Sequence, residues 1–119
     1  TDYGAFVELE PGVEELVHIK SLESLDLMGT KISDASFCKI ARLPRLRNLE
    51  VRNTSIGDVG IACLQGHATL EYLNIKEARV TDKSLPIIMT ISKLKKLDTG
   101  FSNERLKPLR LKLRGVTIN

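Results

Sequence analysis

Residues 22–34 read Leu-Glu-Ser-Leu-Asp-Leu-Met-Gly-Thr-Lys-Ile-Ser-Asp, and this pattern returns at a constant interval along the chain. Its first leucine recurs at Leu22, Leu46, Leu70 and Leu94. The spacing Leu-x-x-Leu-x-Leu ends in the alternation of inward and outward side chains that a strand needs. Apolar residues at every third position in the second half of each period suit a helix or a 3₁₀ turn. Each unit is therefore predicted to be a strand, a turn and a short helix, which buries its apolar face by stacking on its neighbours.

The register of the periods places the elements. Strands are expected near residues 23–28, 47–52, 71–76 and 95–99, and short helices near 34–42, 59–66 and 83–92. Aspartate stands just before each helical segment, at Asp34, Asp58 and Asp82. We expect these aspartates to act as N-caps, because a carboxylate there accepts hydrogen bonds from free backbone N–H groups. The hydroxyls of Thr30 and Thr54 are expected to bond the turn that follows each strand.

Residues 22–93, and again 106–118, resemble a leucine-rich repeat protein of the bacterial type. The resemblance implies an α/β solenoid with parallel strands on its concave face and short helices on its convex face. It also implies protein binding more often than catalysis. The sequence then divides into a solenoid at residues 21–119 and an irregular N-terminal hairpin or cap at residues 1–20.

The pattern is interrupted near the C-terminus. Residues 94–105 begin a repeat that stops about halfway through the period, and the template restarts at Leu106, Leu109 and Leu111. This restart predicts a strand near 109–113, which Pro108 would place at an edge of the sheet. Gly100 to Arg105 would then be a tight loop, or a point at which residues have been lost.

The N-terminal segment departs from the repeat in another way. Residues 1–20 resemble strands two and three of an S-one RNA-binding domain, an oligonucleotide-binding barrel. The resemblance implies that Tyr3, Phe6 and His18 contact RNA bases. Two alternatives stay open: a cap over the open end of the solenoid, and a designed or recombined chimeric chain that joins two unrelated proteins without a natural function.

Stacked strands convert equal repeat positions into columns of neighbours, roughly 4.8 Å apart, on the concave face. The columns give a mixed-charge surface on which Tyr72 and Arg52 are the expected anchors, since tyrosine and arginine dominate binding hot spots. The alternative is that these charges only solvate the sheet and pair along each strand, as Glu50 would with Arg52. The predicted partner-binding residues are Asp26, Met28, Asn48, Glu50, Arg52, Tyr72, Asn74, Lys76, Lys96 and Asp98.

The most basic stretch lies at the C-terminus and contains Lys107, Arg110, Lys112 and Arg114. These cations are expected either to protect an edge strand from aggregation or to contact phosphate groups. The preferred function is a non-catalytic scaffold that binds a protein through the concave face. The second is RNA or single-stranded nucleic-acid binding through the N-terminal hairpin and this basic strip. Self-association through open strand edges is a further expectation.

Composition and the lack of known catalytic or metal-binding motifs exclude several classes of function. Net charge is +3, 42% of residues are hydrophobic, and no apolar run approaches the roughly 20 residues of a membrane span. No metal-ligand spacing, catalytic triad or phosphate-binding loop is visible, so we expect no enzyme, metal site or cofactor. Cys38 and Cys63 are expected to be reduced and packed, which favours the cytoplasm, although stacking leaves a disulfide open. His67 is expected to be a satisfied, partly buried histidine. Gly57 and Gly60 are expected to supply backbone freedom to a repeat turn.

Overall fold

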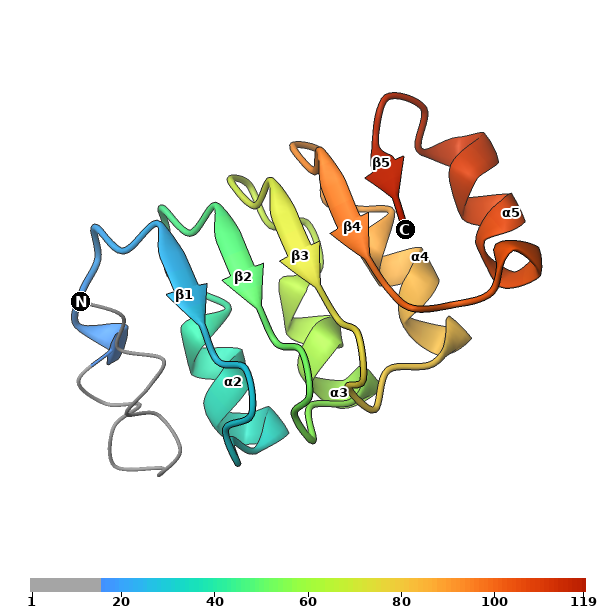
Figure 1. Ribbon diagram of the computed structural model, residues 1–119. Coiled ribbons are helices and arrows are strands. Elements are labelled where there is room, and N and C mark those ends of the chain that lie inside the picture. The colour runs from blue at the N-terminus through green and yellow to red at the C-terminus, as the bar shows by residue number, and fades with distance from the viewer. Residues whose placement is uncertain (1–15) are drawn as a thin grey trace.

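The computed structural model describes residues 16–119, which form one stack of strand, turn and helix units (Figure 1). Five parallel strands lie side by side in chain order and make a single sheet. They are β1 (Ser24–Asp26), β2 (Asn48–Glu50), β3 (Tyr72–Asn74), β4 (Lys96–Asp98) and β5 (Thr117–Ile118). The first four lie within the predicted ranges, so the strand prediction is confirmed there.

Helices form a second layer behind the sheet (Figure 1). In chain order they are α2 (Asp34–Ile40), α3 (Asp58–Ile61) with the 3₁₀ turn η2 (Ala62–Leu64), η3 (Asp82–Ser84) with α4 (Leu85–Ile88), and α5 (Asn103–Lys112). The predicted helical ranges before residue 93 are therefore confirmed. These helices are short because each one only has to return the chain to the start of the next strand.

The register follows the sequence period. Leu25 pairs with Leu49, Leu49 with Leu73 and Leu73 with Leu97, each step being one full repeat. All four leucines are at most 3% exposed. A leucine buried to this extent contributes roughly 1.5–3 kcal/mol relative to an exposed one, so the column holds the repeats in register.

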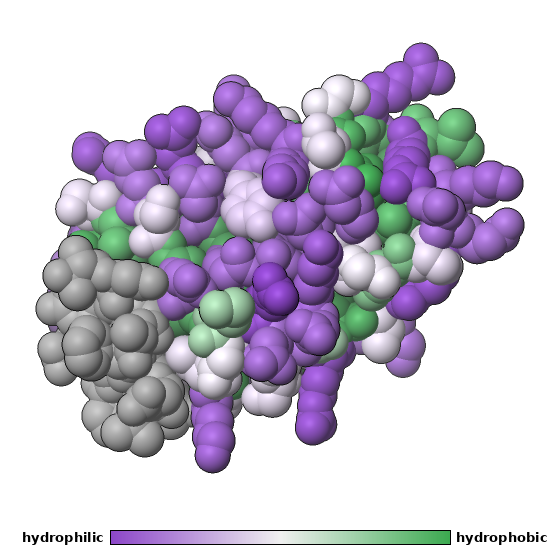
Figure 2. Space-filling view, viewed as in Figure 1, coloured by the Kyte–Doolittle hydropathy of each residue, from purple (hydrophilic) through white to green (hydrophobic). Residues whose placement is uncertain are grey.

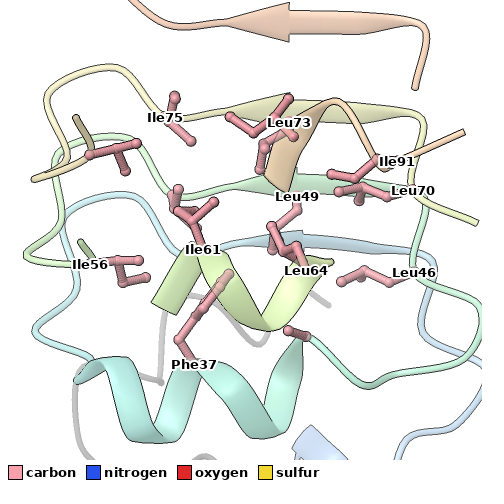
Figure 3. Packing of buried hydrophobic residues seen from close by; sticks show 14 of the residues in the cluster. Phe37, Leu46, Leu49, Ile56, Ile61, Leu64, Leu70, Leu73, Ile75 and Ile91 are labelled. Carbon is pink, nitrogen blue, oxygen red and sulfur yellow. The ribbon is translucent and has the colours of Figure 1, made fainter. Parts of the chain in front are cut away.

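The core lies between the sheet and the helices (Figure 3). Phe37 from α2 and Ile61 from α3 point toward Leu49 and Leu73 of the sheet, and all four are fully buried. Phe37 is the bulkiest fully buried side chain. Because every repeat adds residues to the same continuous cluster, no single repeat has a core of its own.

The predicted strand near 109–113 is wrong. Residues 103–112 form the helix α5, which buries Leu106 and Leu109 and leaves Leu111 72% exposed. Leucines three positions apart share one face of a helix, so Leu-x-x-Leu-x-Leu fits a helix as well as a strand. The last strand is β5, in which Thr117 pairs with Lys96 after a shorter step than in the earlier repeats. The last repeat is thus a compact one with its own helix. Of the predicted loop 100–105, residues 100–102 lead into α5 and residues 103–105 are its first turn.

The predicted aspartate N-caps are also wrong in detail. Ser33 and Thr81 are the residues that cap α2 and η3 through their hydroxyls, and α3 has Gly57 at its N-cap position, without a side-chain cap. The aspartates sit one position later and bond the next repeat instead, Asp82 through the side chain of Arg105 and the other two through the backbone. Asp34 Oδ1 accepts from the backbone N–H of Gly57 at 2.9 Å, and Asp58 Oδ1 accepts from that of Thr81 at 2.8 Å. These carboxylates therefore fasten neighbouring turns together.

The threonine prediction is confirmed. Thr30 Oγ1 donates to the carbonyl of Leu27 and Thr54 Oγ1 donates to that of Val51, both at 2.8 Å. Both threonines are buried, so each hydroxyl needs a partner and finds one in its own turn.

Among residues 16–119 we find no helix with the length and hydrophobicity of a transmembrane span.

Candidate functional site

The strand face, the side of the sheet turned away from the helices, carries all ten of the predicted partner-binding residues. Alternation turns Ser24 and Asp26 outward while Leu25 is buried, and β2 repeats this pattern. In β3 and β4 the residues equivalent to Asp26, Asn74 and Asp98, are buried. Pairing continues past the assigned strands, since the N–H of Gly29 donates to the carbonyl of Arg52 at 3.2 Å. Met28 and Arg52 are therefore neighbours at the end of the face. Figure 2 shows that hydrophilic side chains cover most of this side of the molecule.

Tyr72 is held in place by its neighbours on this face. Its hydroxyl donates to Asp98 Oδ2 at 2.8 Å, and Asn119 Nδ2 donates to Asp98 Oδ1 at 2.9 Å. The ammonium of Lys96 lies 5.6 Å from the centre of the Tyr72 ring. Burial and the bond to Asp98 raise the pKa of Tyr72 to about 12. Tyr72 therefore stays a neutral donor at physiological pH, with one ring face under a cation.

Asp98 is stabilised as a carboxylate by the same contacts. Burial alone raises its pKa, but the hydrogen bonds from Asn119 and Tyr72 outweigh that cost, and the pKa lies below its ordinary value. Asn119 follows β5 in the last repeat. Sequence analysis missed its role because the template placed the last strand too early.

Asp26 and Glu50 form the acidic part of the face. They are directly paired across β1 and β2. Burial, and then the charge of Asp26, raise the pKa of Glu50 above its ordinary value. Arg52 does not pair with Glu50 as the alternative interpretation expected; its guanidinium lies 3.6 Å from Glu77 instead.

A shallow pocket of about 380 Å³ opens over this part of the sheet. Its lining residues are Ser24, Leu25, Asp26, Asn48, Leu49, Glu50 and Tyr72. Asn48 Nδ2 donates to Ser24 Oγ at 2.9 Å, which fixes one wall. The other six predicted residues lie outside this lining: Met28, Arg52, Asn74, Lys76, Lys96 and Asp98. Among them, Asn74 Oδ1 accepts from the backbone N–H of Lys76.

Comparison with known proteins finds one matching family and a similar solved structure. The family model described as Leucine Rich repeat matches residues 18–40. A solved structure of Leiomodin-1 Actin-Binding Site 2 superposes with a TM-score of 0.69, covering 90% of this chain and 76% of that one at 11% identity. The chain thus matches the leucine-rich repeat family over one repeat, and it shares the solenoid fold of the leiomodin structure. No curated protein sequence matches it.

A ladder of alternating charge precedes the strands of this repeat protein and was not foreseen. Glu23, Arg47, Glu71 and Lys95 occupy the same position in successive repeats. Arg47 contacts Glu23 at 3.3 Å and Glu71 at 3.0 Å, and Lys95 contacts Glu71 at 3.5 Å. Hydrogen bonds from Arg47 lower the pKa of Glu71. The sequence alone could have predicted this ladder, because one repeat position carries charges of alternating sign and equal repeat positions become neighbours in the stack.

The predicted RNA site is not assembled among the described residues of the repeat protein. Tyr3 and Phe6 lie outside residues 16–119. Leu16 and Val17 are helical and not extended, so the expected third barrel strand is wrong at that point, and His18 is a turn residue. Leu16 instead packs into the core as the helical end of a preceding repeat.

The basic strip lies at the other end of the solenoid (Figure 1). Lys107, Arg110 and Lys112 are on α5, and Arg114 follows it. Arg110 is engaged internally, donating to Asn103 Oδ1 at 3.0 Å and to the carbonyl of Ile118 at 2.9 Å. His18 and this strip therefore do not share one surface of the repeat protein.

The cysteines correct another expectation. Cys38 and Cys63 form a disulfide between α2 and η2, with their Cα atoms 5.3 Å apart. The prediction of reduced thiols is therefore wrong, and the cytoplasmic location inferred from it has no support.

His67 is as predicted: it is half-buried, and its Nδ1 accepts from the backbone N–H groups of Thr69 and Leu70. Burial lowers its pKa below the ordinary value.

The described residues offer no cluster of three or more His, Cys, Asp or Glu side chains that could hold a metal ion. The strand face presents fixed hydrogen-bond groups, one aromatic ring and charges of both signs.

Proposed function

We propose that this protein is a non-catalytic interaction scaffold that binds a protein partner through its strand face. The observation that carries the proposal is the pocket beside Tyr72, on a sheet face that no other element of residues 16–119 covers. A rigid sheet bearing preset side chains loses little conformational entropy on binding.

The composition of the face supports a protein partner. Met28 is 52% exposed although it is a large apolar residue; Arg52 lies just beyond β2 and Tyr72 lies on β3. Methionine, arginine and tyrosine are enriched in protein interfaces. Asp26 and Glu50 would repel phosphate groups, which disfavours nucleic acid on this face.

The structural neighbour is consistent with this class of function. The leiomodin structure is that of an actin-binding site, so a similar solenoid serves as a protein-binding element there. At 11% identity the likeness concerns the fold, and we do not extend the actin partner to this chain. Nothing among the described residues favours RNA binding as a second function.

The test is capture of partners from a native extract by cross-linking and quantitative mass spectrometry. The face variant Met28→Asp with Arg52→Glu changes two exposed residues, and Tyr72→Ala with Arg52→Ala removes both anchors. A matched control on the helical side is Val59→Asp with Arg42→Glu, since Val59 is 71% exposed and Arg42 is also exposed. Circular dichroism checks that each variant is folded.

We expect proteins enriched by the wild type to fall at least tenfold with either face variant, a loss of about 1.4 kcal/mol or more, and to remain with the control. Equal enrichment by the wild type and both face variants would remove the strand face from consideration.

A further inference from the structure

Asp26 and Glu50 are an unneutralised acidic pair in the pocket of the strand face. They stand directly opposite each other on β1 and β2, where like charges destabilise a sheet. No described Lys or Arg forms an ion pair with either carboxylate. Arg52, whose charge acts on Glu50 from just beyond β2, makes its ion pair with Glu77. This half of the face thus keeps a local excess of negative charge in a chain whose net charge is +3.

Glu50 also has an unsatisfied polar atom. Its Oε1 is shielded from solvent and has no hydrogen-bond partner. A buried carboxylate oxygen without a donor is rare, and each case calls for an explanation. Elsewhere on the face the acidic groups are satisfied, since Asp98 accepts from both Tyr72 and Asn119. The missing donor at Glu50 is therefore local to the pocket.

The shape of the pocket indicates what could supply that donor. Its volume of about 380 Å³ lies in the range that accommodates an organic group and exceeds what a bare ion needs. It opens onto the sheet, and its lining residues come from β1, β2 and β3, with Tyr72 on the third strand. A long side chain with a terminal cation matches this form, since its stem can pack against apolar surface while its head reaches a carboxylate.

We propose that this pocket receives a Lys or Arg side chain from an extended basic segment of a protein partner, seated between Asp26 and Glu50. The proposal rests on the proposed function and specifies the partner's chemistry. A guanidinium or ammonium would donate to Glu50 Oε1 and relieve the repulsion between the two carboxylates. The segment would run over the sheet toward Tyr72. The negative charges of Asp26 and Glu50 therefore favour a basic segment over an acidic or phosphorylated one.

The test uses an array of nine-residue peptides probed with the fluorescent whole protein at low and moderate salt. Its members carry zero to three Lys or Arg residues at varied spacing in a Gly-Ser-Leu background, and matched members carry Glu at the same places. The groove variant is Asp26→Asn with Glu50→Gln, which keeps side-chain size and removes two charges. The control Asp82→Asn with Glu104→Gln removes the same charge outside the pocket.

We expect the wild type and the control to bind basic members selectively, and the groove variant to bind the best of them at least tenfold more weakly in solution anisotropy measurements. Binding that shows no preference for basic over acidic members would overturn the inference. So would equal weakening by both variants, because only overall charge would then matter. Spermine that competes as well as the best peptide would make the occupant a small polycation and also overturn it.

The two proposals fail separately. If partner capture depends on Met28, Arg52 and Tyr72 but the array shows no selective basic binding, the interaction scaffold stands and the basic segment falls. If neither capture nor array binding depends on the face, both fall.

Discussion

At the scale of single residues, Tyr72 shows how the repeat geometry converts an ordinary side chain into a fixed one. The bond to Asp98 spans 26 residues of sequence but one step of the stack. Burial and the hydrogen bond to the Asp98 carboxylate both favour the neutral phenol, which is why the pKa of Tyr72 reaches about 12. The same contact gives Asp98 a donor, so neither group is left unpaired where water is scarce.

Alkaline titration of Tyr72 tests this contact. In a Tyr3→Phe background the phenolate absorbance should report Tyr72 alone and give a pKa of about 12, against an ordinary value of 10.0. Asp98→Asn should lower the pKa toward its ordinary value without reaching it, because burial remains. Asp26→Asn is the matched control and should leave the pKa unchanged. A phenol that titrates at its ordinary value in the wild type would contradict the contact.

The sign of the linked stability change follows. Between pH 10.0 and about 12 the unfolded chain loses the phenol proton while the folded chain retains it. Stabilisation by this group is therefore complete below the unfolded pKa and is lost as the pH rises through that window. Tyr72→Phe should flatten this part of the stability profile.

The role of Gly60 could not be predicted from the sequence. Its place in the repeat predicts a need for backbone freedom, but it lies inside α3 and has no left-handed backbone. A Cβ there would lie 2.6 Å from Asp34 Oδ1 and 3.2 Å from Phe37 Cδ2. The glycine is therefore required by the carboxylate that ties one repeat to the next. Sequence could identify the aspartate position, but not that it reaches across repeats.

At the scale of elements, the strands were predictable and the last helix was not. Four strands follow from one leucine column, because burial of that column permits a single register. α5 shares its leucine spacing with the strand template, and only the capping residue distinguishes the two. Ser102 Oγ accepts from the backbone N–H of Arg105, and the helix begins soon after the chain leaves β4.

Pro108 provides a test of this assignment. It lies inside α5 and cannot donate to the carbonyl four residues earlier. Pro108→Ala should therefore raise the free energy of unfolding by about 1–2 kcal/mol, since proline is costly in a helix interior. Denaturant unfolding measures the change, and Pro86→Ala is the control, because Pro86 is in the first turn of α4 where proline is tolerated. A neutral or destabilising Pro108→Ala would contradict an interior helical position.

The candidate site was predicted at the same scale only in outline. Aligning the repeats placed Asp26, Glu50 and Tyr72 on one face, because parallel strands in register bring equal repeat positions side by side. It did not give the pairing of Arg52 with Glu77, since Glu77 lies in the turn beyond β3 and has a left-handed backbone. Side-chain partners that arise from turns depend on local backbone geometry, which the repeat pattern does not encode.

At the scale of the whole molecule, stability is distributed along a stack in which each repeat contacts only its neighbours. The stack measures 39 × 24 × 21 Å, so its long axis follows the order of the strands. In such an array any cross-link between adjacent repeats acts on the shared interface. The Asp34 and Asp58 bonds act on the turn side, the Glu23–Arg47–Glu71 ladder acts at the start of the strands, and the disulfide between Cys38 and Cys63 joins the helical layer.

Removing this disulfide should lower the stability of the whole stack. Its cysteines are separated by 25 positions, and closing a loop of that size stabilises a fold by about 3 kcal/mol through the unfolded chain. For a domain of this length we expect Cys38→Ala with Cys63→Ala to lower Tm by about 10 °C. The wild type in a phosphine reductant should unfold at a similar temperature, while the variant should be indifferent to the reductant. Because α2 and α3 share one core with the strands, the decrease should appear as a shift of a single transition. Two reactive thiols in the native protein under non-reducing conditions, or an unchanged Tm on reduction, would show that the helical layer is held by packing alone.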